Sequence, residues 1–205
     1  MTCIEMDRLH PSTRQALADC CDMHRNIMRL FPSPNSGNIR EEEQILYRVV
    51  EHKNALQLYV TSRSKPNLAE ARWLKGESCR QRDMQPLLDA FANDQVYSFD
   101  LLAHPSKKIK GEGKNSTRVF LRTPEERAQW LHRQGEKYGF RIAGLREEEP
   151  YDLRGKRSTG IMLIRAIRFC GQLQVTDAEA FRLAYQNGIG AEKAYGLGML
   201  MLSRG

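Results

Sequence analysis

Long apolar runs are missing from this sequence of 205 residues. No run approaches the roughly 20 apolar residues that a helix needs to cross a bilayer. The opening stretch, MTCIEMDRLHP, contains no apolar core of a signal peptide. The five cysteines are odd in number and scattered, and reduced thiols of this kind are typical of the cytosol. These absences predict a cytoplasmic protein without a membrane segment.

Motifs for metal ions and nucleotide cofactors are missing as well. The cysteines never occur with C-x-x-C spacing, and the five histidines never form an H-x-x-x-H pair. The glycine-rich segment GIGAEKAYGLG, residues 188–198, follows a helix pattern and precedes a strand pattern. Dinucleotide loops and P-loops have the opposite order, because they follow a strand and open a helix. We therefore expect neither a metal ion nor a small-molecule cofactor.

The glycines of this segment call for two different explanations. Gly188 fits the left-handed cap that commonly ends a helix. Gly196 and Gly198 lie too far beyond the helix to act as caps. They indicate that another group closely approaches the backbone there.

The charge balance is positive, with 32 Lys and Arg against 25 Asp and Glu and a net charge of +7. It favours a polyanionic partner, and nucleic acid before membrane, since no basic amphipathic helix is present. Two basic stretches lie between strand patterns and are predicted to be mobile loops that contact phosphates. A solvated basic surface is the alternative interpretation. The first stretch contains Lys107, Lys108, Lys110, Lys114 and Arg118, and the second contains Arg154, Lys156 and Arg157.

The apolar periodicity predicts an α+β fold in two blocks. In the first block, Ser12 or Thr13 is expected to cap the segment that follows. The predicted elements of this block are a strand at 2–6, a helix at 19–31 and an antiparallel hairpin with strands at 45–50 and 56–61. Residues 62–93 give no clear pattern, because Pro and Gly interrupt any long element.

The second block has a clearer order of elements. Its predicted strands lie at 96–103, 140–144, 161–169, 173–175 and 199–202, and its predicted helices lie at 124–138 and 178–186. Thr123 caps the first helix, with Glu126 in the capping-box position. The order β-α-β-β-α-β is that of the ferredoxin-like unit. The first block is interpreted as a degenerate copy, which gives domains at 1–93 and 94–205.

His24 is the candidate for proton transfer. In the segment ADCCDMHRNIMRLFP it shares a helix face with Ile27 and Phe31, which is typical of a partly buried core histidine. Histidine is also the side chain most readily poised for proton transfer near neutral pH. Arg25 and Arg29 on an adjacent face can hold a phosphate beside the imidazole. These residue patterns leave both interpretations open.

Several short motifs, taken in order, resemble one protein family. They are HRNIMRLFP near the start, VYSFDLLAHPSKK in the middle, RTPEERAQWL later, and GQLQVTDAEAF ahead of QNGIGAEKAYGLGML. Their order and the intact last segment extend the likeness to nearly the whole chain. The sequence resembles the CasE endoribonucleases of type I-E CRISPR systems.

The resemblance implies two ferredoxin-like domains in tandem with antiparallel sheets. Such proteins bind the hairpin of CRISPR repeat RNA and cut once, without a metal ion, at the 3′ base of the stem. The 2′-hydroxyl attacks the adjacent phosphate and leaves a 2′,3′-cyclic phosphate and a 5′-hydroxyl. They then retain the mature guide RNA as a subunit of the Cascade complex. The expected partners are therefore the repeat RNA, the guide RNA and the other Cascade subunits.

The resemblance also assigns catalysis to His24, as general acid or general base. The family often has a tyrosine three residues earlier, where this chain has Cys21. The thiol of Cys21 either orients the site or is a small packing residue. Arg25 or Arg29 either offsets charge on the phosphorane or lies on an exposed helix face.

RNA binding is expected to follow the A-form shape, with the two basic stretches as clamps on the stem. By resemblance, the glycine-rich segment lies beside the RNA backbone, with Lys193 near a phosphate. Compensation of a local dipole is the other interpretation of Lys193. The candidate residues of this segment are Gly188, Gly190, Lys193, Gly196 and Gly198.

Two other classes of function remain compatible with the sequence. The first is a catalytically inactive CRISPR RNA-binding subunit, which the missing tyrosine favours. The second is a structural subunit with a basic surface that binds no RNA. Cleavage of a repeat hairpin separates the enzyme from the first class, and salt-dependent RNA binding separates it from the second.

Overall fold

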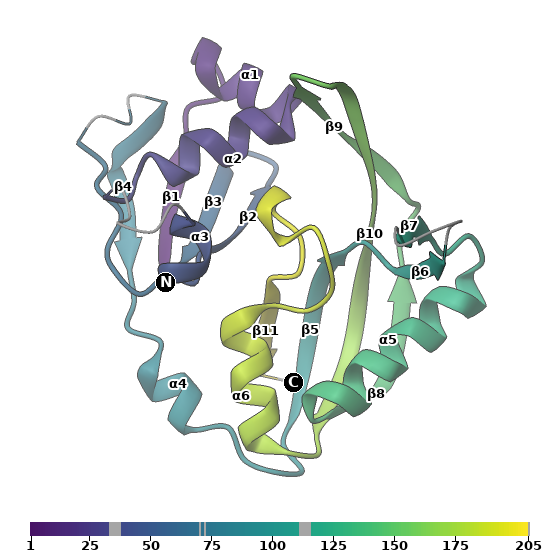
Figure 1. The fold of residues 1–205 in the computed structure, drawn as a ribbon. Coiled ribbons are helices and arrows are strands. Elements are labelled where there is room, and N and C mark those ends of the chain that lie inside the picture. The colour runs from purple at the N-terminus through teal and green to yellow at the C-terminus, as the bar shows by residue number, and fades with distance from the viewer. Residues whose placement is uncertain (33–37, 70, 72, 111–115, 205) are drawn as a thin grey trace. The chain divides into compact units, whose positions relative to one another are not determined.

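The computed structural model describes residues 1–32, 38–69, 71, 73–110 and 116–204 (Figure 1). Two packing units are present. Unit 1 consists of Met1–Leu88, Leu153–Ile164 and Lys193–Gly196, and unit 2 consists of Asp89–Asp152, Arg165–Glu192 and Leu197–Gly205. They cut across the predicted division into 1–93 and 94–205, because two short segments of the second half pack with unit 1. No helix within the described ranges is long and apolar enough to cross a membrane.

Unit 1 is built on an antiparallel sheet in the order β2-β3-β1-β4. Alternate residues such as Ile4, Leu58 and Val60 are fully buried, and they pack in one core with Ile27. The first and second strands have the third inserted between them, which is the split arrangement of a ferredoxin-like fold. The strand predicted at 2–6 and the predicted hairpin are confirmed. The strands are β1 (Thr2–Met6), β2 (Leu46–Glu51), β3 (Leu56–Thr61) and β4 (Leu74–Gln81).

The first helix of unit 1, α1 (Pro11–Ala18), is capped differently from the prediction. Neither Ser12 nor Thr13 is the cap, because Nδ1 of His10 accepts the Ser12 N–H at 3.2 Å and makes His10 the N-cap. The Thr13 side chain is buried instead, and its hydroxyl donates to the carbonyl of Trp73 at 3.2 Å.

Asp19 separates α1 from the next helix, α2 (Cys20–Met28). Its backbone is extended, and its carboxylate accepts the N–H groups of Cys21 and Asp22 at 2.9 and 3.2 Å. This is an N-cap interaction. The helix predicted at 19–31 is therefore present but ends earlier. The region that gave no clear pattern contains β4 and α4 (Gln85–Asp89), and a short helix α3 (Ile39–Glu42) precedes β2.

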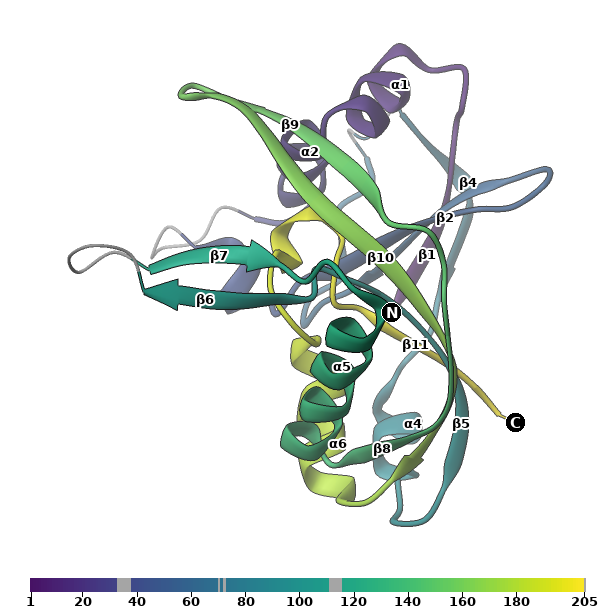
Figure 2. The same cartoon turned by 90° about the vertical axis from the view of Figure 1, so that its right-hand side faces the viewer.

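Unit 2 confirms the predicted β-α-β-β-α-β order. Its sheet has the antiparallel order β11-β5-β10-β8, and Figure 2 shows α5 and α6 side by side on one face of it. The two strands predicted at 161–169 and 173–175 are one continuous strand, since β10 keeps its pairing with β5 through Gly171. The elements are β5 (Val96–Ala103), α5 (Pro124–Tyr138), β8 (Phe140–Glu147), β10 (Gly160–Val175), α6 (Ala178–Asn187) and β11 (Leu200–Arg204).

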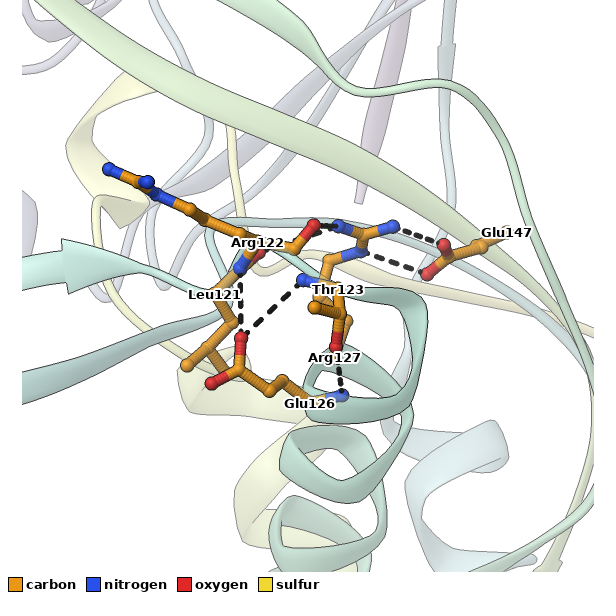
Figure 3. Close-up of polar contacts among 6 residues, drawn as sticks. All are labelled: Leu121, Arg122, Thr123, Glu126, Arg127 and Glu147. Carbon is orange, nitrogen blue, oxygen red and sulfur yellow. Dashed lines mark hydrogen bonds and ion pairs between the residues drawn. The ribbon is translucent and has the colours of Figure 1, made fainter.

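The start of α5 is fixed by the predicted capping box (Figure 3). Thr123 Oγ1 accepts the Glu126 N–H at 3.2 Å, and the Glu126 carboxylate accepts the Thr123 N–H at 3.4 Å. In the same turn Arg127 is only 5% exposed, and it forms a two-contact ion pair with Glu147 of β8. This buried guanidinium also donates to the carbonyl of Arg122 at 2.6 Å. Helix and sheet are therefore joined by directional contacts as well as by apolar packing.

The two basic stretches are strands, so their prediction as loops is wrong. Lys107, Lys108 and Lys110 lie in β6 (Ser106–Lys110), which pairs with β7 (Ser116–Phe120), the strand that contains Arg118. Arg154, Lys156 and Arg157 lie in β9 (Tyr151–Arg157), which pairs with β10. In β6, Lys107 and Lys108 fall on opposite faces, so this strand lacks the alternation on which strand prediction depends. Lys114 and the side chain of Lys110 lie outside the described residues.

Candidate active site

A pocket of about 450 Å³ lies in unit 1, next to helix α2. It is formed by three segments that are far apart in the sequence: α2, the end of β9 with the turn after it, and the 3-10 turn η1 (Lys193–Tyr195). The lining residues are Cys21, His24, Arg25, Lys156, Arg157, Ser158, Thr159 and Tyr195.

The pocket unites five of the residues selected from the sequence. His24, Cys21 and Arg25 come from α2, and Lys156 and Arg157 come from β9. The other arginine of α2, Arg29, is described at the C-cap of that helix, where it is exposed and donates to Asn26 Oδ1 at 3.4 Å. It is not among the residues that line the pocket.

His24 is half-buried, and its environment favours the neutral imidazole. Burial lowers the pKa of His24, and the positive charges of Arg40 and Arg25 lower it further, against a hydrogen bond to the backbone of Ala194. Nδ1 is buried without a hydrogen-bond partner among the described residues. A neutral imidazole has one ring nitrogen that can accept a proton near pH 7. The side chain is therefore suited to the role of a general base.

Cys21 lines the pocket and is also a packing residue, only 7% exposed. A Cβ atom built on Gly155 of β9 would come within 2.7 Å of Cys21 Sγ and 2.9 Å of Cys20 Sγ. Strand β9 can therefore approach α2 closely because residue 155 is glycine. Burial raises the pKa of the neighbouring Cys20 thiol to about 12, so this sulfur stays protonated and is a poor nucleophile.

Replacement of Cys21 by Tyr is expected to lower the free energy of unfolding by about 1–3 kcal/mol, because the larger side chain overpacks the contact with Gly155. Thermal and denaturant unfolding of the variant measure this effect. Cys21→Ser, which keeps the size of the side chain, is the matched control. Wild-type stability of Cys21→Tyr would contradict the packing role and show that the residue turns freely into the pocket.

The cationic side chains of the pocket differ in how they are held. Arg25 is exposed and pairs with Asp22 of the same helix at 2.8 Å. The backbone N–H of Lys156 donates to Asp19 Oδ1 at 3.2 Å, which ties β9 to the start of α2. The Arg157 guanidinium donates to the Tyr195 hydroxyl and lies 5.7 Å from the centre of that ring. Positive charge is thus concentrated beside the imidazole.

Tyr195, Ser158 and Thr159 are site residues that the sequence analysis missed. The Tyr195 ring packs edge-on to His24, with 6.1 Å between the ring centroids. The one sequence feature that could have indicated Tyr195 is that it is an aromatic residue inside the glycine-rich segment, next to Gly196. Nothing in the local sequence connects it with a histidine near the other end of the chain.

The glycine-rich segment is packed by the protein itself. Gly188 is the C-cap of α6, with its N–H donating to the Ala184 carbonyl at 2.8 Å, but its φ of 75° and ψ of 161° differ from the left-handed conformation that was predicted. The close neighbour of Gly196, which has φ of +80°, is the ring of Tyr47, 3.0 Å from the position of a Cβ atom. Gly190 packs on Trp130 in the same way, and the Gly198 N–H donates to the carbonyl of Leu102 at 2.7 Å.

The basic residues of β6 and β7 belong to unit 2 and do not line the pocket. Lys107 pairs with Glu126 at 3.2 Å, and Arg118 donates to Ser106 Oγ at 3.3 Å. Lys108 is exposed. In the part of the chain that the structure describes, no three His, Cys, Asp or Glu side chains are grouped as ligands for a metal ion.

Comparison with known proteins agrees with this architecture. A family described as CRISPR associated protein matches residues 1–204. The chain is 28% identical over 213 residues to the CRISPR-associated endoribonuclease Cse3 of Thermus thermophilus, covering 95% of this chain and 96% of that protein. A structure of Thermus thermophilus Cse3 bound to an RNA representing a pre-cleavage complex matches with a TM-score of 0.81 and 25% identity, over 98% of this chain and 97% of that chain.

A chain of a CRISPR RNA-guided surveillance complex shares the fold, with a TM-score of 0.69 and 24% identity over 100% of both chains. The antiparallel tandem fold expected from the sequence is therefore found in solved structures as well. Since the family match extends over nearly every residue, the chain belongs to the CRISPR-associated protein family.

Proposed function

We propose that this protein is a metal-independent endoribonuclease that binds the hairpin of CRISPR repeat RNA and cuts it at the 3′ base of the stem. It then retains the mature guide RNA as a subunit of Cascade in the cytoplasm. Two ferredoxin-like domains, at 1–93 and 94–205, are part of this proposal. The observation that carries this proposal is His24, half-buried and with a lowered pKa, in one pocket with Lys156 and Arg157.

The chemistry of the pocket suits internal attack on a phosphodiester. The neutral imidazole of His24 accepts the proton of the 2′-hydroxyl. The 2′-oxygen forms a bond to phosphorus while the bond from phosphorus to the 5′-oxygen breaks, and the leaving oxygen takes a proton from solvent. The products are a 2′,3′-cyclic phosphate and a 5′-hydroxyl. Arg157 and Lys156 supply positive charge where the phosphorane becomes more negative.

The ribbon of β6 and β7 supports binding of an RNA stem. Lys108 and Arg118 are direct partners in the register of the two strands, so two like charges lie opposite each other. Such a pair destabilises an isolated ribbon, and a bound anion offsets the repulsion. The phosphates of an A-form stem supply that anion, because side chains read such a duplex mainly by shape and phosphate contacts. The glycine-rich segment is proposed to lie beside the sugar-phosphate backbone of the same RNA, with Lys193 near a phosphate.

The test of the proposed function is a single-turnover cleavage assay. The full chain is mixed in excess with a synthetic repeat hairpin from a CRISPR array of the same genome. We expect one cut at the 3′ base of the stem, with an upstream fragment that ends in a 2′,3′-cyclic phosphate. Tight binding of the intact hairpin without a cut would support the inactive RNA-binding subunit instead.

The cleavage rate is expected to depend on pH through His24. Because the pKa of His24 lies below its usual value of 6.5, the base is available at neutral pH and is lost only as the pH falls through this lowered value. The pH profile of kcat/KM, which reports on the free enzyme, measures this pKa. Arg40→Gln removes a charge that lowers the pKa, so the acidic limb should move to higher pH.

Arg133→Gln, at an exposed position of α5, is the matched control, and its pH profile of kcat/KM should equal that of the wild type. A rate that rises as the pH falls through this region would contradict the assignment of His24 as base and indicate that it acts as an acid.

Neutralising the basic strands should weaken RNA binding in a salt-dependent way. Each lost phosphate contact should flatten the dependence of log affinity on log salt by roughly 0.7–0.9. The affinity of the variant Lys107→Gln/Lys108→Gln/Arg118→Gln should therefore depend less steeply on salt. The rate at which it cuts fully bound RNA should be nearly unchanged. Changes at Lys156 and Arg157 should lower both the affinity for RNA and the cleavage rate, because these residues also line the pocket.

Hairpin affinity across a salt series, paired with saturating single-turnover rates, measures both effects. Lys53→Gln, in the exposed turn between β2 and β3, is the control. An unchanged salt slope in the triple variant would mean that β6 and β7 are only a solvated surface.

A further inference from the structure

Tyr195 is a site residue that the proposed mechanism does not yet use. It lies in η1, within unit 1, and its side chain lines the pocket together with His24. The two rings meet edge to face at an interplanar angle of 60°. Aromatic packing of this kind fixes the plane of the phenol, so the hydroxyl has a limited set of positions.

The hydroxyl of Tyr195 is oriented by Arg157. The guanidinium donates to the phenolic oxygen, while its central carbon lies 5.7 Å from the ring centroid. A tyrosine hydroxyl can accept a hydrogen bond and still has one proton to donate. Since the contact with Arg157 uses the accepting side, the Tyr195 proton remains available for a third group in the pocket.

The backbone on both sides of Tyr195 is held by a second tyrosine, Tyr47 of β2. The Tyr47 side chain is 2% exposed, and its hydroxyl donates to the carbonyl of Ala194 at 2.8 Å. Its ring also lies against Gly196, where a Cβ atom would come within 3.0 Å of it. Residue 195 is therefore flanked by two positions that the core of unit 1 fixes. A donor held in this way needs little rearrangement when charge develops next to it.

We propose that Tyr195 is a catalytic residue whose hydroxyl donates a hydrogen bond to a non-bridging oxygen of the scissile phosphate. The bond strengthens as this oxygen gains charge in the phosphorane, and no proton is transferred along it. Arg157 holds the phenol in place and adds positive charge at the same oxygen. This role deepens the proposed endoribonuclease function and rests on it.

The variant Tyr195→Phe tests the hydroxyl alone. It keeps the ring that packs on His24 and lies beside Arg157, so the fold and the affinity for the hairpin should be unchanged. The saturating single-turnover rate should fall about 10²-fold, as is typical when one donor to a developing oxyanion is removed. Tyr59→Phe is the matched control, because the Tyr59 hydroxyl bonds to Gln57 on the sheet of unit 1 at 2.7 Å, and its rate should equal that of the wild type.

A sulfur substitution in the RNA distinguishes a contact with the phosphate from a structural effect. Replacing the contacted non-bridging oxygen by sulfur weakens its hydrogen bond, so one diastereomer of the phosphorothioate should slow the wild-type protein. In Tyr195→Phe the rates on the oxygen and sulfur substrates should be nearly equal, because the donor is already absent. A variant that had merely distorted the pocket would keep the full sulfur effect on top of its own.

The outcomes separate the two proposals. A wild-type protein that cuts and a Tyr195→Phe variant that cuts equally fast would overturn the role of Tyr195 and leave the endoribonuclease function in place. A slowed variant with the full sulfur effect would also overturn it. A wild-type protein that never cuts the hairpin would overturn the proposed function and, with it, the role of Tyr195.

Discussion

The variant His24→Ala is expected to cut the repeat hairpin roughly 10²–10⁴-fold more slowly than the wild type, the usual cost of losing one general acid or base. Hairpin affinity should stay nearly the same, because the cations that line the pocket and those on β6 and β7 are intact. Single-turnover rates at saturating protein, together with equilibrium binding, separate the two quantities. The size of the effect follows from the position of His24, whose lowered pKa keeps a base available at neutral pH.

His132→Ala is the matched control for this variant, because His132 is exposed on α5, in unit 2. It should cut at the wild-type rate. Added imidazole should restore part of the activity of His24→Ala if the missing group is a proton acceptor. Wild-type speed in His24→Ala would remove this residue from the mechanism.

A 2′-deoxy substitution at the nucleotide just upstream of the cut is expected to abolish cleavage. The substitution removes the nucleophile itself, and internal attack depends on that oxygen lying in line with the leaving oxygen. The substrate should still bind, since the phosphates are unchanged. Gel analysis of labelled hairpins measures both results, and a 2′-deoxy substitution elsewhere in the stem is the control.

The same mechanism needs no metal-bound water, so excess chelator should leave the wild-type rate unchanged. Persistent cutting of the 2′-deoxy substrate would point to attack by water. Loss of activity in chelator, with recovery on addition of a divalent ion, would likewise refute the metal-independent mechanism.

Local signals predicted the elements whose causes are local. The capping box of Thr123 and Glu126 marked the start of α5, and the apolar alternation of 56–61 marked a strand with one buried face. The basic strand β6 escaped prediction for the opposite reason. Lys107 and Lys108 fall on its two faces, so the period of two on which a strand is recognised is missing. In β9 this period is present, since Leu153 and Gly155 alternate with charged residues, but the clustered cations favour a loop.

The sequence by itself determined the α+β order of elements, the resemblance to one family, and the choice of His24 and the basic stretches as candidates. Only the tertiary structure decided which of these residues share a pocket. Arg29 is on the same helix as His24 but not in the site, whereas Tyr195 reaches it from near the other end of the chain.

The physical reason is that packing, and not spacing along the chain, sets the neighbours of a side chain. The pKa of His24 is lowered by its burial and by Arg40, and the close approach at Gly196 comes from the ring of Tyr47. No periodicity or motif encodes these contacts, because each joins segments that only the folded core of unit 1 brings together.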